Sequence, residues 1–117
     1  YEIDSTHSGF ANYDNDQQKM YDAIISASQA AAASIPAKII PAGTLIQTIR
    51  TTVPEFDYAK GGLSMNRDGY HMTYDYGRFA VAALWLRTLT GITVQAEEFE
   101  DFDPALLQKI LAVINAQ

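Results

Sequence analysis

The sequence predicts an α/β fold in which helices predominate and one or two short parallel strands contribute to a buried sheet. A long helical pattern precedes Pro36, and a short β-branched stretch with Ile39 and Ile40 follows it. A helix that leads into a short buried strand is half of a βαβ unit, the building block of parallel sheets. With 117 residues and 48% hydrophobic content, the chain is long enough to bury the core of one domain.

Residues 1–117 are expected to form a single domain or a C-terminal fragment of one. Prolines and turn-forming residues mark most of the boundaries between its elements. These elements are a lead-in loop (1–13), a helix (14–35), a strand (38–42), a helix (44–51), a long loop (55–73), a helix (75–90) and a terminal helix (104–116).

The first two elements differ in composition. Residues 1–13 are rich in Ser, Gly, Asn and Asp, which favour turns. In residues 14–35, Met20, Ile24 and Ala27 recur at three- and four-residue spacing, which is typical of one helix face. The sequence therefore predicts a loop followed by an amphipathic helix.

Two prolines bound the predicted strand. Pro36 ends the preceding helix, and the short apolar stretch within 38–42 runs up to Pro41, as in a buried parallel strand. Thr44 is a candidate N-cap for the helix 44–51, whose apolar residues again recur at helical spacing.

The second half of the chain alternates between loop and helix. Residues 55–73 contain a Lys-Gly-Gly turn and no clear periodicity. Residues 75–90 are apolar on nearly every face, so this helix must be covered on more than one side. An Asp-Pro pair then provides an N-cap and a first-turn proline for the helix 104–116.

Composition and charge exclude several functions. The formal net charge is -6, and the eight Lys and Arg residues are scattered, which argues against binding to nucleic acid. No run of eighteen apolar residues is present, so no membrane span is expected. The chain has no cysteine, which excludes disulfides and thiolate metal sites. Tyr1–Asp4 does not begin a signal peptide, although a signal on a preceding N-terminal part would make the protein secreted or periplasmic, so the compartment stays open.

The best candidate for chemistry is the pair Asp68 and His71, spaced as D-x-x-H in a loop with Gly69 between them. A carboxylate within one turn of a histidine can accept its Nδ1 proton and orient the ring, so that Nε2 acts as a general base. The same spacing also suits an Asp that merely caps a loop or the next helix.

The sequence around this pair resembles the last conserved block of the SGNH (GDSL-like) hydrolase superfamily, in a bacterial branch of it. That block carries the Asp and His of a catalytic triad as D-x-x-H and is followed by a helix. One departure is Met72, where many members have Pro or Leu. The resemblance extends from about Tyr1 to about Gly91 and rests on Leu63-Ser64-x-x-Arg67-Asp68-Gly69-Tyr70-His71-Met72-Thr73, Tyr76-Gly77-Arg78-Phe79, Thr6-His7-x-Gly9-Phe10, Asp16-Gln17-Gln18-x-Met20-Tyr21, Ile39-Ile40-Pro41-Ala42-Gly43 and Leu84-Trp85-Leu86-x-Thr88-Leu89-Thr90-Gly91.

The resemblance implies that the chain is the C-terminal portion of a three-layer αβα, flavodoxin-like SGNH fold. It also implies a serine ester hydrolase, with Asp68 and His71 as triad acid and base in the catalytic-type loop 55–73. The substrate class that it suggests is acetylated carbohydrate, which would make the enzyme a carbohydrate esterase. The nucleophilic Ser and the oxyanion donors would lie outside this chain, so the isolated chain is expected to be inactive. Its partners would be the missing N-terminal half of the enzyme and a small-molecule or carbohydrate ester, and no metal or organic cofactor is implied.

Two polar side chains are candidate substrate contacts. Tyr70 lies between Asp68 and His71 in the sequence and is expected to line a cleft. His7 lies in the lead-in loop, which the resemblance places near the rim of the active site. A surface or hydrogen-bonded role is the alternative for His7.

Other functions remain open at this point. The chain could be a non-catalytic binding or interaction domain in which His71 is structural. It could instead be a metal-dependent hydrolase that uses Asp4, His7, Asp68 and His71. Ser8 and Ser64 are candidate nucleophiles within the chain, but neither is placed at a strand-to-helix turn.

Overall fold

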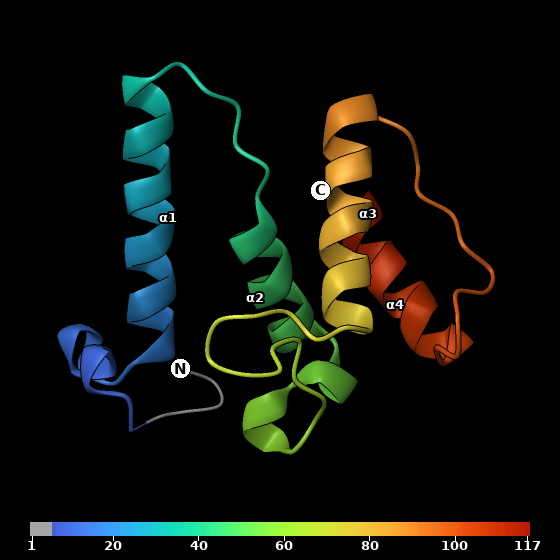
Figure 1. The fold of residues 1–117 in the computed structure, drawn as a ribbon, viewed down its shortest axis with the longest axis horizontal. Coiled ribbons are helices and arrows are strands. Elements are labelled where there is room, and N and C mark those ends of the chain that lie inside the picture. Colours follow the sequence, from blue (N-terminus) through green and yellow to red (C-terminus); the bar gives the residue numbers. More distant parts are fainter. Residues whose placement is uncertain (1–5) are drawn as a thin grey trace.

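The computed structural model describes residues 6–117, and it is built from helices joined by ordered loops (Figure 1). Its extents of 41 × 39 × 21 Å make it flat. The elements are η1 (Ser8–Tyr13), α1 (Gln17–Ser34), α2 (Ala42–Thr52), η2 (Pro54–Phe56), η3 (Tyr58–Lys60), α3 (Tyr76–Thr90) and α4 (Pro104–Asn115), where η denotes a 3-10 helix.

The predicted α/β fold class was wrong. Residues 6–117 form no strand and no sheet, so the parallel strands of a flavodoxin-like αβα arrangement are not seen. The segment predicted as strand 38–42 is an irregular connection that passes into α2 at Ala42, and Ile39 is partly exposed. A strand needs a neighbouring strand for its backbone N–H and C=O groups, and this segment has none among the described residues.

The lead-in loop contains more regular structure than its composition predicts. Residues 8–13 form the 3-10 helix η1, and residues 1–5 of the predicted loop lie outside the described part. Asp14 and Asn15 then take left-handed backbone angles, with φ of 56° and 53°. Because of this turn, α1 begins at Gln17. Asp16 is its N-cap, and the Asp16 carboxylate accepts hydrogen bonds from two backbone N–H groups of the first turn.

The hydrophobic core lies between α2, α3 and α4. Apolar side chains from these helices meet Phe56 of η2 and two loop residues, Met65 and Val94. Phe56 is fully buried and packs edge-on against Tyr76 at the start of α3. The members that are fully excluded from solvent on the helices are Leu45, Ile49, Ala80, Leu84, Leu107, Ile110 and Ile114.

Helix α1 is different, because none of its residues is buried. It stands beside α2 in Figure 1 and is joined to it by side-chain hydrogen bonds between Gln17, Gln18 and Gln47. Ile24 remains 48% exposed. A helix that buries so little gains little stability from packing within this chain.

The far ends of α3 and α4 are held together by polar contacts. Arg87 on α3 donates to the backbone oxygens of Ile92 and Asn115 at 3.1 and 2.8 Å. The Asn115 side chain in turn pairs with both backbone groups of Val94 at 2.9 Å. Gly91, with φ of 74°, ends α3 in the left-handed conformation that glycine adopts readily at the end of a helix.

The start of α3 positions the loop that carries His71. The Thr73 hydroxyl accepts a hydrogen bond from the Gly77 N–H at 2.9 Å, while the backbone N–H of Thr73 donates to the Met65 carbonyl at 2.9 Å. Because Met65 is buried in the core, these contacts tie the loop to the helix bundle.

Among residues 6–117, none of the helices combines the length and the apolarity that a bilayer crossing requires.

Two glycines in matched positions test how tightly the loop meets α3. Gly77 and Gly43 are each the second residue of their helix. A methyl group at Gly77 would overlap the Met65 carbonyl and the Thr73 hydroxyl, whereas one at Gly43 would meet no atom within 4 Å. We expect Gly77→Ala to lower the free energy of unfolding by about 1–3 kcal/mol.

Gly43→Ala is the control, and it should leave that free energy unchanged or raise it by up to about 1 kcal/mol, since Ala is the better helix former. Urea denaturation of both variants measures the difference. Equal stability of the two variants would show that the loop does not approach α3 as closely as described.

Candidate functional site

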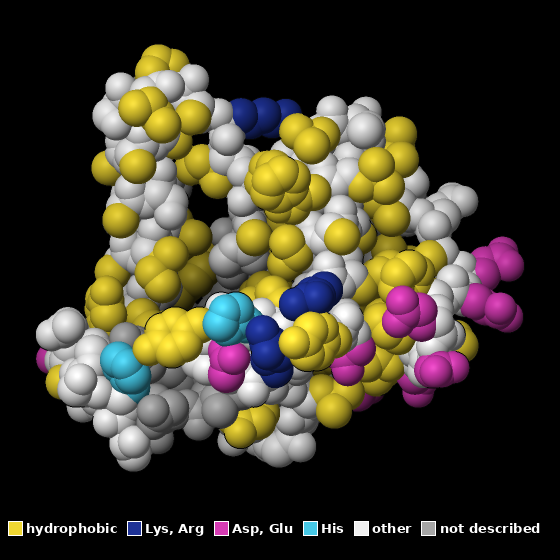
Figure 2. Space-filling model, viewed as in Figure 1, with side chains coloured by type: hydrophobic (Ala, Val, Ile, Leu, Met, Phe, Trp, Pro, Cys, Tyr) yellow, Lys and Arg dark blue, Asp and Glu magenta, His cyan; other side chains and the backbone are white. Residues whose placement is uncertain are grey.

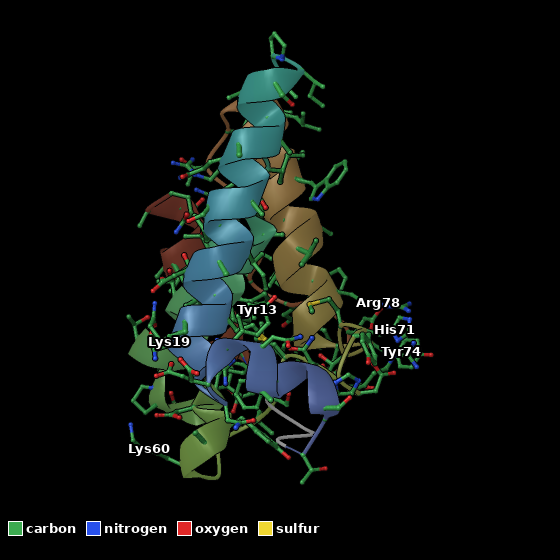
Figure 3. The ribbon with its side chains drawn as sticks, turned by 90° about the vertical axis from the view of Figure 1, so that its left-hand side faces the viewer. Tyr13, Lys19, Lys60, His71, Tyr74 and Arg78 are labelled. Atoms are coloured by element: carbon green, nitrogen blue, oxygen red, sulfur yellow. The ribbon has the colours of Figure 1, made fainter. Side chains whose placement is uncertain are left out.

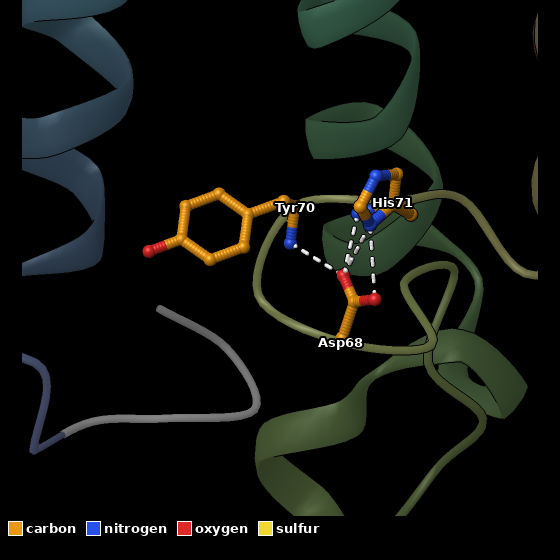
Figure 4. A network of polar contacts seen from close by, with 3 residues as sticks. All are labelled: Asp68, Tyr70 and His71. Atoms are coloured by element: carbon orange, nitrogen blue, oxygen red, sulfur yellow. Dashed lines mark hydrogen bonds and ion pairs between the residues drawn. The ribbon is translucent and has the colours of Figure 1, made fainter.

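Asp68 organises the tip of the loop between Met65 and Thr73. Its Oδ1 accepts hydrogen bonds from the backbone N–H groups of Tyr70 and His71 at 2.9 and 2.8 Å (Figure 4). Both of its carboxylate oxygens also face Nδ1 of His71, at 3.0 and 2.9 Å. The predicted acid–base pair is therefore brought into contact, and the same carboxylate shapes the loop around it.

The base of this loop is closed by backbone contacts. Asn66 and Met72 form an isolated antiparallel bridge, and the Arg67 N–H donates to the His71 carbonyl at 3.0 Å. The Ser64 hydroxyl accepts from the Asn66 N–H at 2.9 Å. The side chains of Asp68 and His71 are thus presented on a loop whose two sides are fixed to each other.

Hydrogen bonds lower the pKa of Asp68. The backbone N–H of Tyr70, the backbone N–H of His71 and the His71 ring, in this order of importance, lower the pKa of Asp68 from 3.8 to about 2. The group is therefore a carboxylate at neutral pH and can only accept hydrogen bonds. In consequence, the neutral ring of His71 carries its proton on Nδ1, which leaves Nε2 as an acceptor.

His71 is not part of the core. Its side chain is 63% exposed and that of Asp68 is 45% exposed. Nε2 lies on the side of the ring away from Asp68 in Figure 4, and it makes no hydrogen bond within residues 6–117. This is the arrangement that a general base requires, because the accepting nitrogen is free to meet another group.

The two candidate substrate contacts lie together, which the sequence did not indicate. The Tyr70 hydroxyl lies 2.9 Å from Nε2 of His7, and the rings meet edge to face. Since Nδ1 of His7 accepts from the Gly9 N–H at 3.1 Å, the neutral ring carries its proton on Nε2 and donates it to the Tyr70 oxygen. The Tyr70 hydroxyl proton is then available to a further acceptor.

A shallow pocket of about 650 Å³ lies on the outer side of His71, between the loop and α3. It is lined by Tyr70, His71, Arg78 and Trp85, with smaller apolar side chains between them. A second hollow of about 250 Å³ lies between α1 and α2 and is lined by Asp68 but not by His71. We regard the first as the candidate substrate pocket, because it reaches the exposed histidine.

The sequence predicted part of this pocket but missed Arg78 and Trp85. Both come from the helix predicted over 75–90, whose apolar pattern indicates only that it is covered on more than one side. The charge of Arg78 was an available signal. A cation in the first turn of a helix interacts unfavourably with the positive end of the helix dipole, and this indicates a role other than helix stabilisation.

The residues of the metal-hydrolase alternative are not gathered into one site. No three His, Cys, Asp or Glu side chains within residues 6–117 lie close enough together to bind a metal ion. Asp4, the remaining member of that proposed set, lies outside the described residues. Ser8 lies in η1 and Ser64 faces Asn66, and neither hydroxyl is hydrogen-bonded to His71.

The fold and site together define a helical chain that presents an exposed Asp–His pair beside a shallow pocket. The sequence matches the family model described as "Domain of unknown function (DUF4886)" over residues 1–108. The chain therefore belongs to the DUF4886 family. A comparison with curated proteins found no match.

A solved structure also resembles this chain. It is a DUF4886 family protein from Bacteroides uniformis ATCC 8492, with 37% sequence identity and a TM-score of 0.80. The similarity covers 99% of this chain and 43% of that protein. The chain thus spans less than half the length of this relative.

The low pKa of Asp68 can be measured directly. The carboxyl carbon of Asp68, followed by NMR as pH is lowered, should titrate with a midpoint near 2. Because its pKa falls on folding, the ionised group stabilises the folded chain at pH above about 3.8, and this contribution is lost as pH falls toward 2. A midpoint near 3.8 would show that the hydrogen bonds from Tyr70 and His71 do not form in solution.

Proposed function

We propose that this chain supplies the acid and the base of a Ser-His-Asp triad in an ester hydrolase of the SGNH type. The observation that carries the proposal is the contact between the Asp68 carboxylate and Nδ1 of His71, a residue that lines an open pocket and whose Nε2 makes no hydrogen bond within residues 6–117. The D-x-x-H block and the flanking motifs of the sequence are the second line of support.

In this proposal, the reaction follows the acyl-enzyme route of other serine hydrolases. His71 Nε2 takes the proton of a Ser hydroxyl as the Ser oxygen attacks the carbonyl carbon of the ester. The resulting imidazolium is stabilised by Asp68 and returns the proton to the leaving alcohol as the C–O bond breaks. Water then attacks the acyl carbon as His71 Nε2 takes its proton, and the imidazolium returns the proton to the Ser oxygen as the acyl–Ser bond breaks, which releases the acid and restores the enzyme.

The nucleophile would come from a part of the protein outside these 117 residues. Two features support this. No Ser hydroxyl within residues 6–117 is hydrogen-bonded to His71, and the solved relative is more than twice as long as the matched region. The exposed apolar side chains of Ile24 and Leu89 would suit contact with such a part. An acetylated carbohydrate is the substrate class that the sequence resemblance suggests.

A structural role for His71 is the main alternative. It is less well supported, because a ring that is 63% exposed contributes little packing to a core. Asp68 already holds the loop through two backbone N–H groups, so the loop does not depend on the ring alone.

The proposal predicts a large loss of activity when the pair is broken in the complete protein. His71→Ala should lower kcat for hydrolysis of 4-nitrophenyl acetate by about a thousandfold or more, and Asp68→Asn by about a hundredfold or more, since both remove general-base catalysis. The measurement is release of 4-nitrophenol at pH 7.5 with protein that shows wild-type unfolding temperature.

Asp57→Asn is the matched control, since Asp57 also lies in the loop region and its carboxylate pairs with Lys60 rather than with His71. It should keep wild-type activity. Full activity of His71→Ala would refute the triad and favour a non-catalytic interaction domain. The isolated 117-residue chain should be inactive in the same assay.

A further inference from the structure

Two arginines share one aromatic ring next to the His71 pocket. The guanidinium carbon of Arg67 lies 4.7 Å from the centre of the Tyr74 ring, and that of Arg78 lies 4.3 Å from the same centre. His71, Tyr74 and Arg78 lie close together at one edge of the molecule, away from Lys19 and Lys60 (Figure 3). Arg78 and His71 also line the same pocket.

Neither guanidinium is neutralised within the part of the chain that the structure describes. The ion pairs found there involve Lys19, Lys60, His71 and Lys109, but neither Arg67 nor Arg78. Figure 2 shows Lys or Arg side chains beside a histidine in the middle of this face, with an acidic side chain next to the histidine and further acidic side chains toward the far edge. A local positive group is unusual in a chain of net charge -6.

A bound negative group would reduce the repulsion between these cations. Two cations on one ring repel each other, and Arg78 also lies in the first turn of α3, where the helix dipole is positive. The planar guanidinium matches carboxylate, sulfate and phosphate groups through paired hydrogen bonds. Stacking on Tyr74 restrains both side chains in advance, which reduces the entropy lost when an anion is bound.

We propose that Arg67, Tyr74 and Arg78 form an anion-binding subsite beside His71, and that the preferred substrate is an ester that carries a carboxylate, sulfate or phosphate group. This inference rests on the proposed function, because the bound ester is a substrate only if the protein is an ester hydrolase. Anion binding at the subsite can be tested without turnover. Val81, Ala82 and Trp85 continue the pocket along α3 beyond Arg78, and they would meet the uncharged part of such an ester.

The kinetic test compares two esters that differ in one charge, 4-acetoxybenzoate and 4-acetoxybenzamide, with the complete protein. We expect kcat/KM to be about tenfold or more higher for the benzoate, as charge-assisted hydrogen bonds imply. In Arg67→Gln and Arg78→Gln this preference should shrink by severalfold, and because it is a ratio of two kcat/KM values, any effect of the substitution that both esters share cancels. High salt should reduce the preference as well.

Lys38→Gln is the matched control. It makes the same change in net charge, and Lys38 binds the Thr88 carbonyl near the C-terminal end of α3, whereas the subsite lies at the N-terminal end of that helix. The preference should be unchanged in this variant. Arg78→Lys should retain only part of it, because Lys keeps the charge but lacks the paired donors.

A binding test separates failure of the subsite from failure of the esterase proposal. Titration calorimetry with 4-hydroxybenzoate and 4-hydroxybenzamide should show binding of the benzoate alone, and the Arg67→Gln/Arg78→Gln double variant should lose it. If the protein hydrolyses neither ester but this binding pattern is found, the subsite stands and the esterase proposal fails.

Two results would overturn the subsite itself. One is equal kcat/KM for the charged and neutral esters, or a preference that survives in the double variant. The other, decisive if neither ester is hydrolysed, is the absence of selective benzoate binding.

Discussion

The carboxylate of Asp68 is the group on which the site depends. It accepts hydrogen bonds from two successive backbone N–H groups and from the ring of His71, all within a single turn of chain. The loop conformation and the state of the histidine ring are therefore set by the same interaction. Because Asp68 and the ring lie at the surface, this order comes from local hydrogen bonds and from the anchoring of Met65 in the core.

The helices could be predicted from the sequence because their signals are local. Side-chain spacing, the left-handed Gly91 and the Asp103-Pro104 start each act within a few residues, and the structure shows all three effects. The strand could not be judged in this way. Ile39 and Ile40 have the composition of a strand, but a strand exists only where another strand pairs with it, and the sequence of one segment does not contain that information.

The contacts of the site also fall into local ones, which the sequence could predict, and long-range ones, which it could not. The contact between Asp68 and His71 follows from a spacing of three residues, so the sequence could place it. The pairing of His7 with Tyr70 joins residues 63 positions apart, and the approach of Arg67 and Arg78 to Tyr74 depends on how the loop enters α3. These contacts depend on tertiary structure, and they give the pocket its polar and charged walls.

The most direct test of this account is the position of the proton on the neutral ring of each of the two histidines, measured by long-range 1H–15N NMR. Asp68 should hold the proton of His71 on Nδ1, whereas the Gly9 N–H should leave the proton of His7 on Nε2, so the two rings are expected to show opposite tautomers. A His71 ring protonated on Nε2 would contradict the account, because that nitrogen could then not act as a base.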